Sequence, residues 1–242
     1  MRMRSEVTGL SRWPWVIGGT AVLVIGGVVL YSQAMPTNTP APTPAPAPAS
    51  SVTPAPQASA AASGAGDDDP GVAPTGCLGG LGRNAAMVLT AQKQAPHTTY
   101  GAVEVAAAFH RWLWQYPDPG VDDITAVSTN VISTDASPAW KDIASEYAAA
   151  GNDPTHGVVS AGTPFHISTT NGLWAVGADS SADQVTVNLA AGYVVDGALS
   201  PTKVAGIALV MKWSNGAWHV FSGNLIDQAL LAQGGIRYTG GC

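Results

Sequence analysis

The chain has 242 residues, of which 10 are Lys or Arg and 16 are Asp or Glu, so its formal net charge is −6. This charge balance offers no electrostatic footprint for a phosphate backbone, which argues against a nucleic-acid-binding protein. Only two residues are cysteines, too few to hold a metal ion without other ligands. The composition changes sharply along the chain, so its segments are interpreted separately.

The N-terminal segments predict a membrane anchor. Residues 1–12 are basic, and residues 13–31 form an uncharged apolar run that is long enough to cross a hydrocarbon core as a helix. Because the arginines precede this run, we expect a cytoplasmic N-terminus and an extracytoplasmic remainder, held at the cell membrane by a single span. The alternative is a cleaved signal peptide with Ser32-Gln33-Ala34 as its processing site. The run is longer than a usual signal-peptide core of roughly 7–15 residues, which favours the anchor.

Residues 32–75 consist mainly of Pro, Ala, Ser and Thr and hold almost nothing large and apolar enough for a core. This composition predicts a disordered linker whose proline-rich part is a stiff, extended spacer. The acidic run Asp67-Asp68-Asp69 lies in this linker. A calcium-binding loop would need further ligands at fixed spacing and a closing carboxylate, and none follows, so we interpret the run as solvated charge.

The two cysteines, Cys77 and Cys242, bracket the globular segment 76–242, and the second lies in the terminal sequence TGGC. Outside the cytoplasm an even number of cysteines favours a disulfide, here one that ties the start of a domain to its end. The alternative is a pair of independent free thiols.

The strongest helix signal in the domain covers Gly101 to Gln115 and is ended by Pro117. Apolar residues occupy most of its circumference, and only Glu104, Arg111 and Gln115 form a polar stripe. A helix of this kind is expected to be surrounded by other elements rather than to lie on a surface.

Two more helices and a strand complete the first half of the domain. A short helix is predicted over Asn84 to Gln94, and another over Pro138 to Ala150 with Ser137 as its N-cap. Between the long helix and the last one, residues 122–134 alternate in polarity well enough to predict a strand.

The second half of the domain is predicted to be strands. The pairs Asn171-Gly172 and Asn215-Gly216 each predict a hairpin turn, because both residue types accept positive φ. Residues 184–195 alternate at period two, with Val185, Val187, Leu189, Ala191, Tyr193 and Val195 on one face. Near the C-terminus, residues 225–232 predict two helical turns, either as a cap over the open end of the domain or as an interaction surface.

Helices followed by hairpin-joined strands predict an α+β domain with a curved antiparallel sheet over its helices. The segments YGAVEVAAAFHRWLWQYP and SNGAWHV resemble the nuclear-transport-factor-2-like cone fold. With its span and proline-rich stalk, the whole chain also resembles the bitopic inner-membrane assembly proteins of type IV secretion and conjugation systems, including those of actinobacterial conjugative elements. This resemblance implies protein partners in an envelope complex and transfers no functional residue.

Motifs for chemistry are missing from the sequence: there is no G-x-S-x-G, H-E-x-x-H, P-loop or G-x-G-x-x-G. The five histidines are scattered, so neither a metal site nor a cofactor is expected. A cone cavity that hosts a ligand or a reaction would draw on the candidate cavity-lining residues His110, Trp114, Tyr193 and His219, with Asp122 or Asp123 at its rim. A structural role is the simpler interpretation in each case. The aromatic and histidine side chains are expected in the core, and the two aspartates are expected to be exposed to water.

These observations favour a non-enzymatic scaffold of an envelope complex over a catalyst. Its expected partners are the membrane, other envelope proteins and possible further copies of itself. The alternatives are a cone-fold module acting on a lipid or cell-wall fragment, and an accessory protein of a lipid import system.

Overall fold

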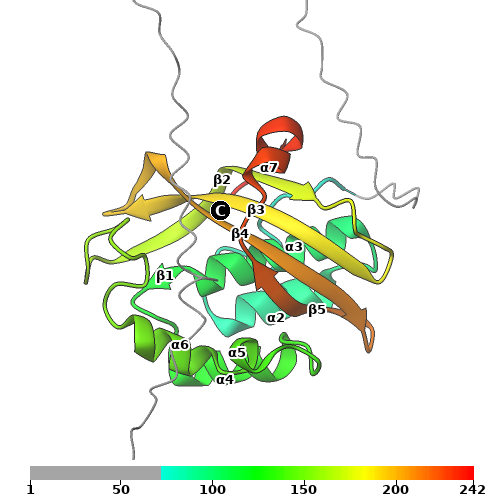
Figure 1. The fold of residues 1–242 in the computed structure, drawn as a ribbon, viewed down its shortest axis with the longest axis horizontal. Coiled ribbons are helices and arrows are strands. Elements are labelled where there is room, and N and C mark those ends of the chain that lie inside the picture. Colours follow the sequence, from blue (N-terminus) through cyan, green and yellow to red (C-terminus); the bar gives the residue numbers. More distant parts are fainter. Residues whose placement is uncertain (1–71) are drawn as a thin grey trace, which may run out of the picture.

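A computed structural model describes residues 72–242 of the chain. The predicted tail 1–12, the span 13–31 and nearly all of the linker 32–75 lie outside the described residues. Residues 72–242 form an α+β unit in which helices pack against one strongly curved antiparallel sheet (Figure 1). In this part of the chain no helix combines the length and the apolar character that crossing a bilayer requires.

Six helices are present in the described part of the chain. They are α2 (Ala85–Gln94), α3 (Thr99–Leu113), α4 (Val121–Asn130), α5 (Pro138–Lys141), α6 (Ile143–Ala150) and α7 (Gln228–Gly234). The first two begin at side-chain caps: Asn84 accepts from the Met87 N–H, and Thr98 accepts from the Gly101 N–H. Both predictions of helices in this region are therefore confirmed, with the long helix displaced by two residues.

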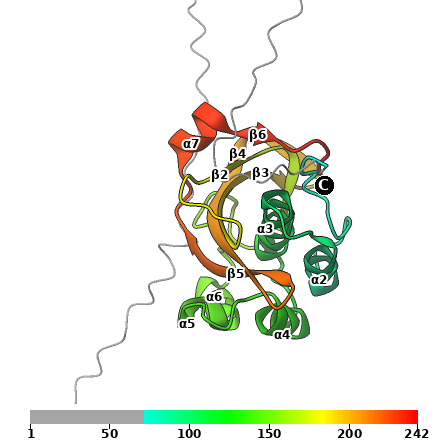
Figure 2. The same ribbon diagram turned by 90° about the vertical axis from the view of Figure 1, so that its right-hand side faces the viewer.

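The strands follow one another in the sheet in the order β1-β2-β3-β4-β5, with β6 pairing to β2. Their bounds are β1 (Gln115–Tyr116), β2 (Phe165–Val176), β3 (Gln184–Val195), β4 (Ala198–Ser214), β5 (Ala217–Asn224) and β6 (Ile236–Arg237). The sheet wraps around α3, which lies in its concave face with α2 beside it (Figure 2).

The core lies between α3 and the concave face of the sheet. The alternating face predicted for β3 is confirmed, since Val185, Val187 and Tyr193 are fully buried. From the helix side, Phe109 and Trp112 are fully buried as well. Apolar side chains thus fill the space that the curved sheet encloses.

The strand predicted over residues 122–134 is wrong, because this segment forms α4. Its buried residues Ile124, Val127 and Val131 recur at helical spacing. Asp122 and Asp123 lie in the first turn, where negative charge favours a helix N-terminus. Only the residues just after the helix pair with a strand, through the bridge from Ile132 to Val220.

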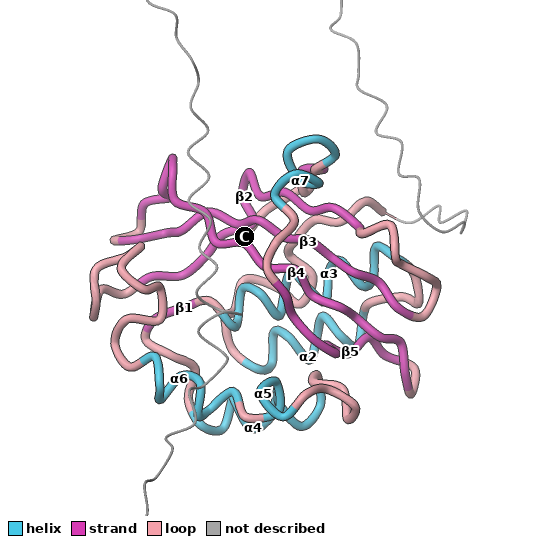
Figure 3. The backbone as a smooth tube through the Cα atoms, in the orientation of Figure 1, coloured by secondary structure: helices cyan, strands magenta, loops and turns pink. Residues whose placement is uncertain are grey.

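The helix predicted from Pro138 to Ala150 is divided in two at Asp142. Asp142 leaves the helical conformation and accepts a hydrogen bond from the Ser145 N–H, so it acts as the N-cap of α6. Ser137 is the N-cap of α5 by position, but its side chain makes no capping bond. Helices α4, α5 and α6 gather at one side of the molecule, and α7 lies at the opposite side (Figure 3).

The two Asn-Gly pairs have different outcomes. Asn215-Gly216 forms the predicted turn between β4 and β5, with positive φ at both residues. Asn171-Gly172 does not join two strands. It lies within β2, where the pairing with β3 shifts register between Ser168 and Leu173, so the pair forms a bulge.

The C-terminal helix α7 packs on the convex face of the sheet. Leu231 joins a small apolar cluster with Ala175 of β2 and Ala190 of β3, outside the main core. The prediction of a helix over residues 225–232 is confirmed, with the helix displaced to Gln228–Gly234. Of the two roles considered for it, the cap over the open end of the domain is wrong, because the helix covers the outer surface of the sheet instead.

Candidate functional site

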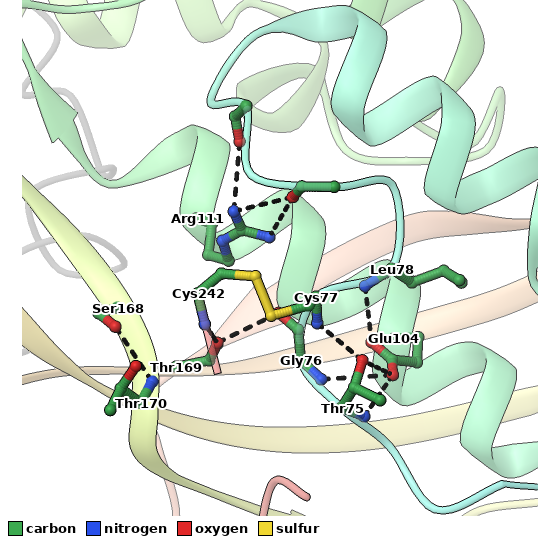
Figure 4. The surroundings of a disulfide bond; sticks show 12 residues. Thr75, Gly76, Cys77, Leu78, Glu104, Arg111, Ser168, Thr169, Thr170 and Cys242 are labelled. Atoms are coloured by element: carbon green, nitrogen blue, oxygen red, sulfur yellow. Dashed lines mark hydrogen bonds between the residues drawn. A yellow bond between two sulfur atoms is a disulfide. The ribbon is translucent and has the colours of Figure 1, made fainter. Parts of the chain in front are cut away.

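The polar stripe of α3 binds the segment through which the chain enters the domain. We call residues 72–83 the entry segment. Glu104 is largely buried, and its carboxylate accepts hydrogen bonds from the backbone N–H groups of Thr75, Gly76 and Leu78 (Figure 4). The Thr75 hydroxyl donates to the same carboxylate at 2.9 Å. Bonds to a charged acceptor are among the stronger hydrogen bonds in proteins, so this carboxylate fixes the path of the entry segment.

Arg111 of α3, and Gln115 at the start of β1 just beyond the helix, extend the same contact. The Arg111 guanidinium is fully buried and donates to the carbonyl oxygens of Gly80 and Gly82 at 3.1 and 3.3 Å. The Gln115 amide donates to the Arg83 carbonyl at 2.8 Å. Burial and the charge of nearby Arg83 lower the pKa of Arg111 to about 10. The whole stripe therefore holds residues 75–83, a segment without helix or strand of its own.

The predicted disulfide between Cys77 and Cys242 is confirmed and lies beside this stripe (Figure 4). It joins residues 165 positions apart. Cys242 is also bound to β2, because its backbone N–H donates to the Thr169 hydroxyl and its carbonyl accepts from the Thr169 N–H. The Thr169 hydroxyl donates in turn to the Gly76 carbonyl. We call this assembly of α3 side chains, disulfide and β2 backbone the entry clamp.

Two of the predicted cavity-lining residues meet at the C-terminal end of α3. The Trp114 indole N–H donates to the Tyr193 hydroxyl at 2.6 Å, and both side chains are buried. Nearby, the Tyr147 hydroxyl donates to the Leu113 carbonyl. Burial raises the pKa of both tyrosines, so both stay protonated. A cavity of about 20 Å³ adjoins Trp114 and Tyr147, which is room for about one water molecule.

His110 lies next to this pair but is enclosed by the core. Its ring is 6.4 Å from that of Trp114, and its Nε2 atom is buried without a hydrogen-bond partner. Burial lowers the pKa of His110 to about 3, so the imidazole is neutral at physiological pH. His110 is therefore a core residue, buried from solvent and without an acidic partner.

His219 is separated from the other three candidates. Its Nδ1 atom lies 3.4 Å from the amide nitrogen of Gln92, near the end of α2 and hence the start of α3. His110 lies roughly 15 Å further along α3, at a rise of 1.5 Å per residue. The candidate residues therefore form no common cavity. His166 on β2 and His219 on β5 also cannot face each other, since β3 and β4 lie between their strands.

Three aspartates lie near the ends of α2 and α4, and the burial of one of them, Asp118, was not predicted from the sequence. Asp123 caps α2 by accepting from the Ala85 N–H at 3.2 Å, and Asp122 is exposed. Asp118 was not singled out, yet its Oδ1 atom is buried without a hydrogen-bond partner. Burial raises the pKa of Asp118 to about 6. Its neighbour Pro117 was interpreted as the end of the long helix, which gave no sign that Asp118 would be buried.

No group of three or more His, Cys, Asp or Glu side chains within residues 72–242 is arranged to hold a metal ion. Comparison of the chain with protein-family models, with curated proteins and with solved structures gives no match. The features of the described residues that bear on function are the entry clamp, the filled core and the convex face of the sheet.

Proposed function

We propose that this protein is a membrane-anchored, non-enzymatic scaffold component of an envelope complex, of the kind that serves conjugation or type IV secretion. Its N-terminus lies in the cytoplasm, one helix spans the membrane, and a proline-rich stalk carries the folded domain outside. In this proposal the stalk sets the distance from the membrane, and the domain supplies the surface that contacts other proteins.

The entry clamp is the observation that carries this proposal. A domain that merely floats on a tether needs no strong contact with the tether's last residues. Here Glu104 and Arg111 of the buried helix α3, and Gln115 of β1 just after it, all bind the entry segment, and a disulfide adds a covalent link. Such a joint fixes the orientation of the domain relative to the end of its stalk, which a spacer in an assembly requires.

The core gives less support to a ligand-binding or enzymatic module for lipids or cell-wall fragments, and to a role in lipid import. A drug-sized ligand needs a pocket of about 300–1,000 Å³. The cavity beside Trp114 measures about 20 Å³, and Phe109 and Trp112 fill the space between α3 and the sheet. Neither of the perturbed groups His110 and Asp118 lines the cavity beside Trp114.

Photo-crosslinking of the full-length protein in its native membrane tests the proposal. A photoreactive amino acid is placed at Leu225, on the exposed link between β5 and α7, or at Val121, at the start of α4 on the other side of the domain. Both side chains are exposed, by 60% and 78% respectively, so neither replacement disturbs the core. We expect envelope-complex subunits, or a second copy of the chain, to be captured from one position and not from the other.

Two results would overturn the scaffold proposal. One is the absence of any protein adduct from either position together with unchanged DNA transfer in a deletion strain. The other is the recovery of a bound lipid or cell-wall fragment when the purified full-length protein is extracted with solvent. The second result would favour the ligand-binding alternative.

A further inference from the structure

The convex face of the sheet carries a groove that the proposed scaffold role does not use. Its volume is about 480 Å³, and it is framed by the β2 bulge on one side and by the start of β4 on the other. Its lining includes Asn171 and Leu173 of β2, Ala190 of β3 and Leu199 of β4. We call it the outer groove. Its lining residues Leu173, Ala190 and Val204 belong to the apolar cluster under α7, whereas α3 lies on the opposite face of the sheet (Figure 2), so the groove is distinct from the main core.

Arg237 at the rim of the outer groove has no acidic partner. Its guanidinium makes only long contacts, 3.5 and 3.4 Å, with the carbonyl and side-chain oxygens of Asn171. Among the described residues no carboxylate forms an ion pair with it, and no Asp or Glu lines the groove. A surface arginine beside a carboxylate-free groove in an acidic protein is complementary to a negatively charged occupant.

The entry segment runs parallel to the C-terminal tail in a constant register. The Thr239 N–H donates to the Pro74 carbonyl at 2.9 Å, and the Thr239 hydroxyl contacts the Ala73 carbonyl at 3.2 Å. Thr239 and Pro74 are 165 positions apart, the same separation as Cys242 and Cys77. Extended by two residues, this register puts Val72, the first described residue, beside Arg237.

Three aspartates, Asp67-Asp68-Asp69, lie just before Val72 in the sequence. Residues 69–72 read Asp-Pro-Gly-Val, and Pro followed by Gly is the central pair of a type II turn. Even a fully extended chain takes Asp69 only about 10 Å from Val72. Chain connectivity therefore leaves Asp69 within reach of the rim of the outer groove.

We propose that the acidic run Asp67-Asp68-Asp69 docks against Arg237 at the rim of the outer groove. This proposal replaces the expectation of a solvated charge run, which concerns residues outside the described part of the chain. Docking neutralises Arg237, the one arginine among the described residues that line the groove.

Carbodiimide coupling in the full chain tests this contact. In the R237K variant, the reagent joins an amine at position 237 to a carboxylate that touches it, and mass spectrometry of the digest identifies the pair. We expect an amide link between position 237 and one of Asp67, Asp68 and Asp69. The link is expected to disappear in about 1 M salt, where the Debye length is about 3 Å, and in the D67N/D68N/D69N variant made on the same background.

The remaining outcomes each overturn the proposal. A free amine ester added to the reaction labels activated carboxylates, so labelling of Asp67–Asp69 without a link to position 237 shows that the contact is absent. A mixture of unlabelled and isotope-labelled chains reveals any link between two copies by its hybrid mass, which would make a second copy the occupant. A link from position 237 to a partner protein, with none to the acidic run, would assign the groove to that partner.

Discussion

Glu104 shows how much one buried carboxylate does in this domain. It accepts three backbone N–H groups and one hydroxyl, all from the entry segment. From the sequence it belonged only to a polar stripe, because helical periodicity shows which side of a helix is polar but not what that side contacts. The stripe itself was predicted, whereas its partner was not, because residues 72–84 have no periodic pattern to place them.

The Glu104→Gln variant is expected to be less stable than wild type by about 2 kcal/mol, because hydrogen bonds to a charged acceptor contribute about 1.5–3 kcal/mol. The amide keeps the shape of the side chain but turns one N–H-accepting oxygen into a donor. Urea denaturation of both proteins measures the difference in the free energy of unfolding. The matched control is Asp196→Asn in an exposed turn, where a change within about 0.5 kcal/mol is expected. Equal stability of Glu104→Gln and wild type would contradict this account of the clamp.

His110 predicts a pH dependence of stability. Its folded-state pKa of about 3 is lower than the unfolded value, so the unfolded chain binds the proton more readily. The contribution of neutral His110 is therefore fully present above pH 6.5 and is lost as the pH falls toward 3. Between pH 7 and pH 5 the loss is about 2 kcal/mol.

The His110→Leu variant isolates this contribution, since leucine is apolar and does not titrate. The raised pKa of Asp118 gives the opposite slope as the pH rises toward 6, but it does so in both proteins. The difference in unfolding free energy between variant and wild type should therefore grow in favour of the variant as the pH is lowered from 7 to 5. A difference that stays constant over this range would show that His110 binds its proton as readily in the folded protein as in the unfolded chain.

At the scale of elements, sequence patterns served well where a local signal and the tertiary environment agree. The β4–β5 turn at Asn215-Gly216 and the alternation of β3 are of this kind. The prediction for residues 122–134 failed because its alternating polarity suggested a strand, while the buried positions Ile124, Val127 and Val131 satisfy a helix that packs against its neighbours. A short segment can fit both periods, and tertiary packing decided between them here.

Asn171-Gly172 failed for a different physical reason. The pair does adopt positive φ at Asn171, as a turn signal suggests, but β2 continues through it. The bulge is explained by a partner that lies far away in the sequence: the C-terminal tail hydrogen-bonds to Thr169 and Gly172 at this point. Nothing local distinguishes a hairpin from a bulge that receives a remote segment.

The Gly172→Ala variant tests the tightness of the bulge. A Cβ atom at this position would lie 2.8 Å from the Ala190 carbonyl oxygen and 2.9 Å from that of Thr169, so the backbone must shift. We expect a loss of about 1–3 kcal/mol in the free energy of unfolding, as for other overpacked sites. Gly234→Ala at the end of α7 is the control, because its Cβ would meet no atom within 4 Å. If urea denaturation gives both variants the same free energy of unfolding, the bulge is looser than described.

At the scale of the whole molecule, the disulfide closes a very long loop. The chain-entropy model assigns about 5 kcal/mol to a loop of this length, and measured losses of native disulfides are about 2–5 kcal/mol. The double variant C77S/C242S is therefore expected to lose about 3–5 kcal/mol in guanidinium denaturation. Wild type denatured in the presence of a reductant should give the same value, and a double variant as stable as the oxidised protein would contradict the expectation.

The disulfide also changes the connectivity of the domain. From Cys77 to Cys242 the chain is a closed covalent ring, and everything before Cys77 is attached to that ring at a single point. A single cut in an exposed turn such as Asn215-Gly216 opens the ring without dividing it into two molecules. The domain can therefore lose one peptide bond and still remain a single covalent molecule, which a linear domain held by packing alone cannot do.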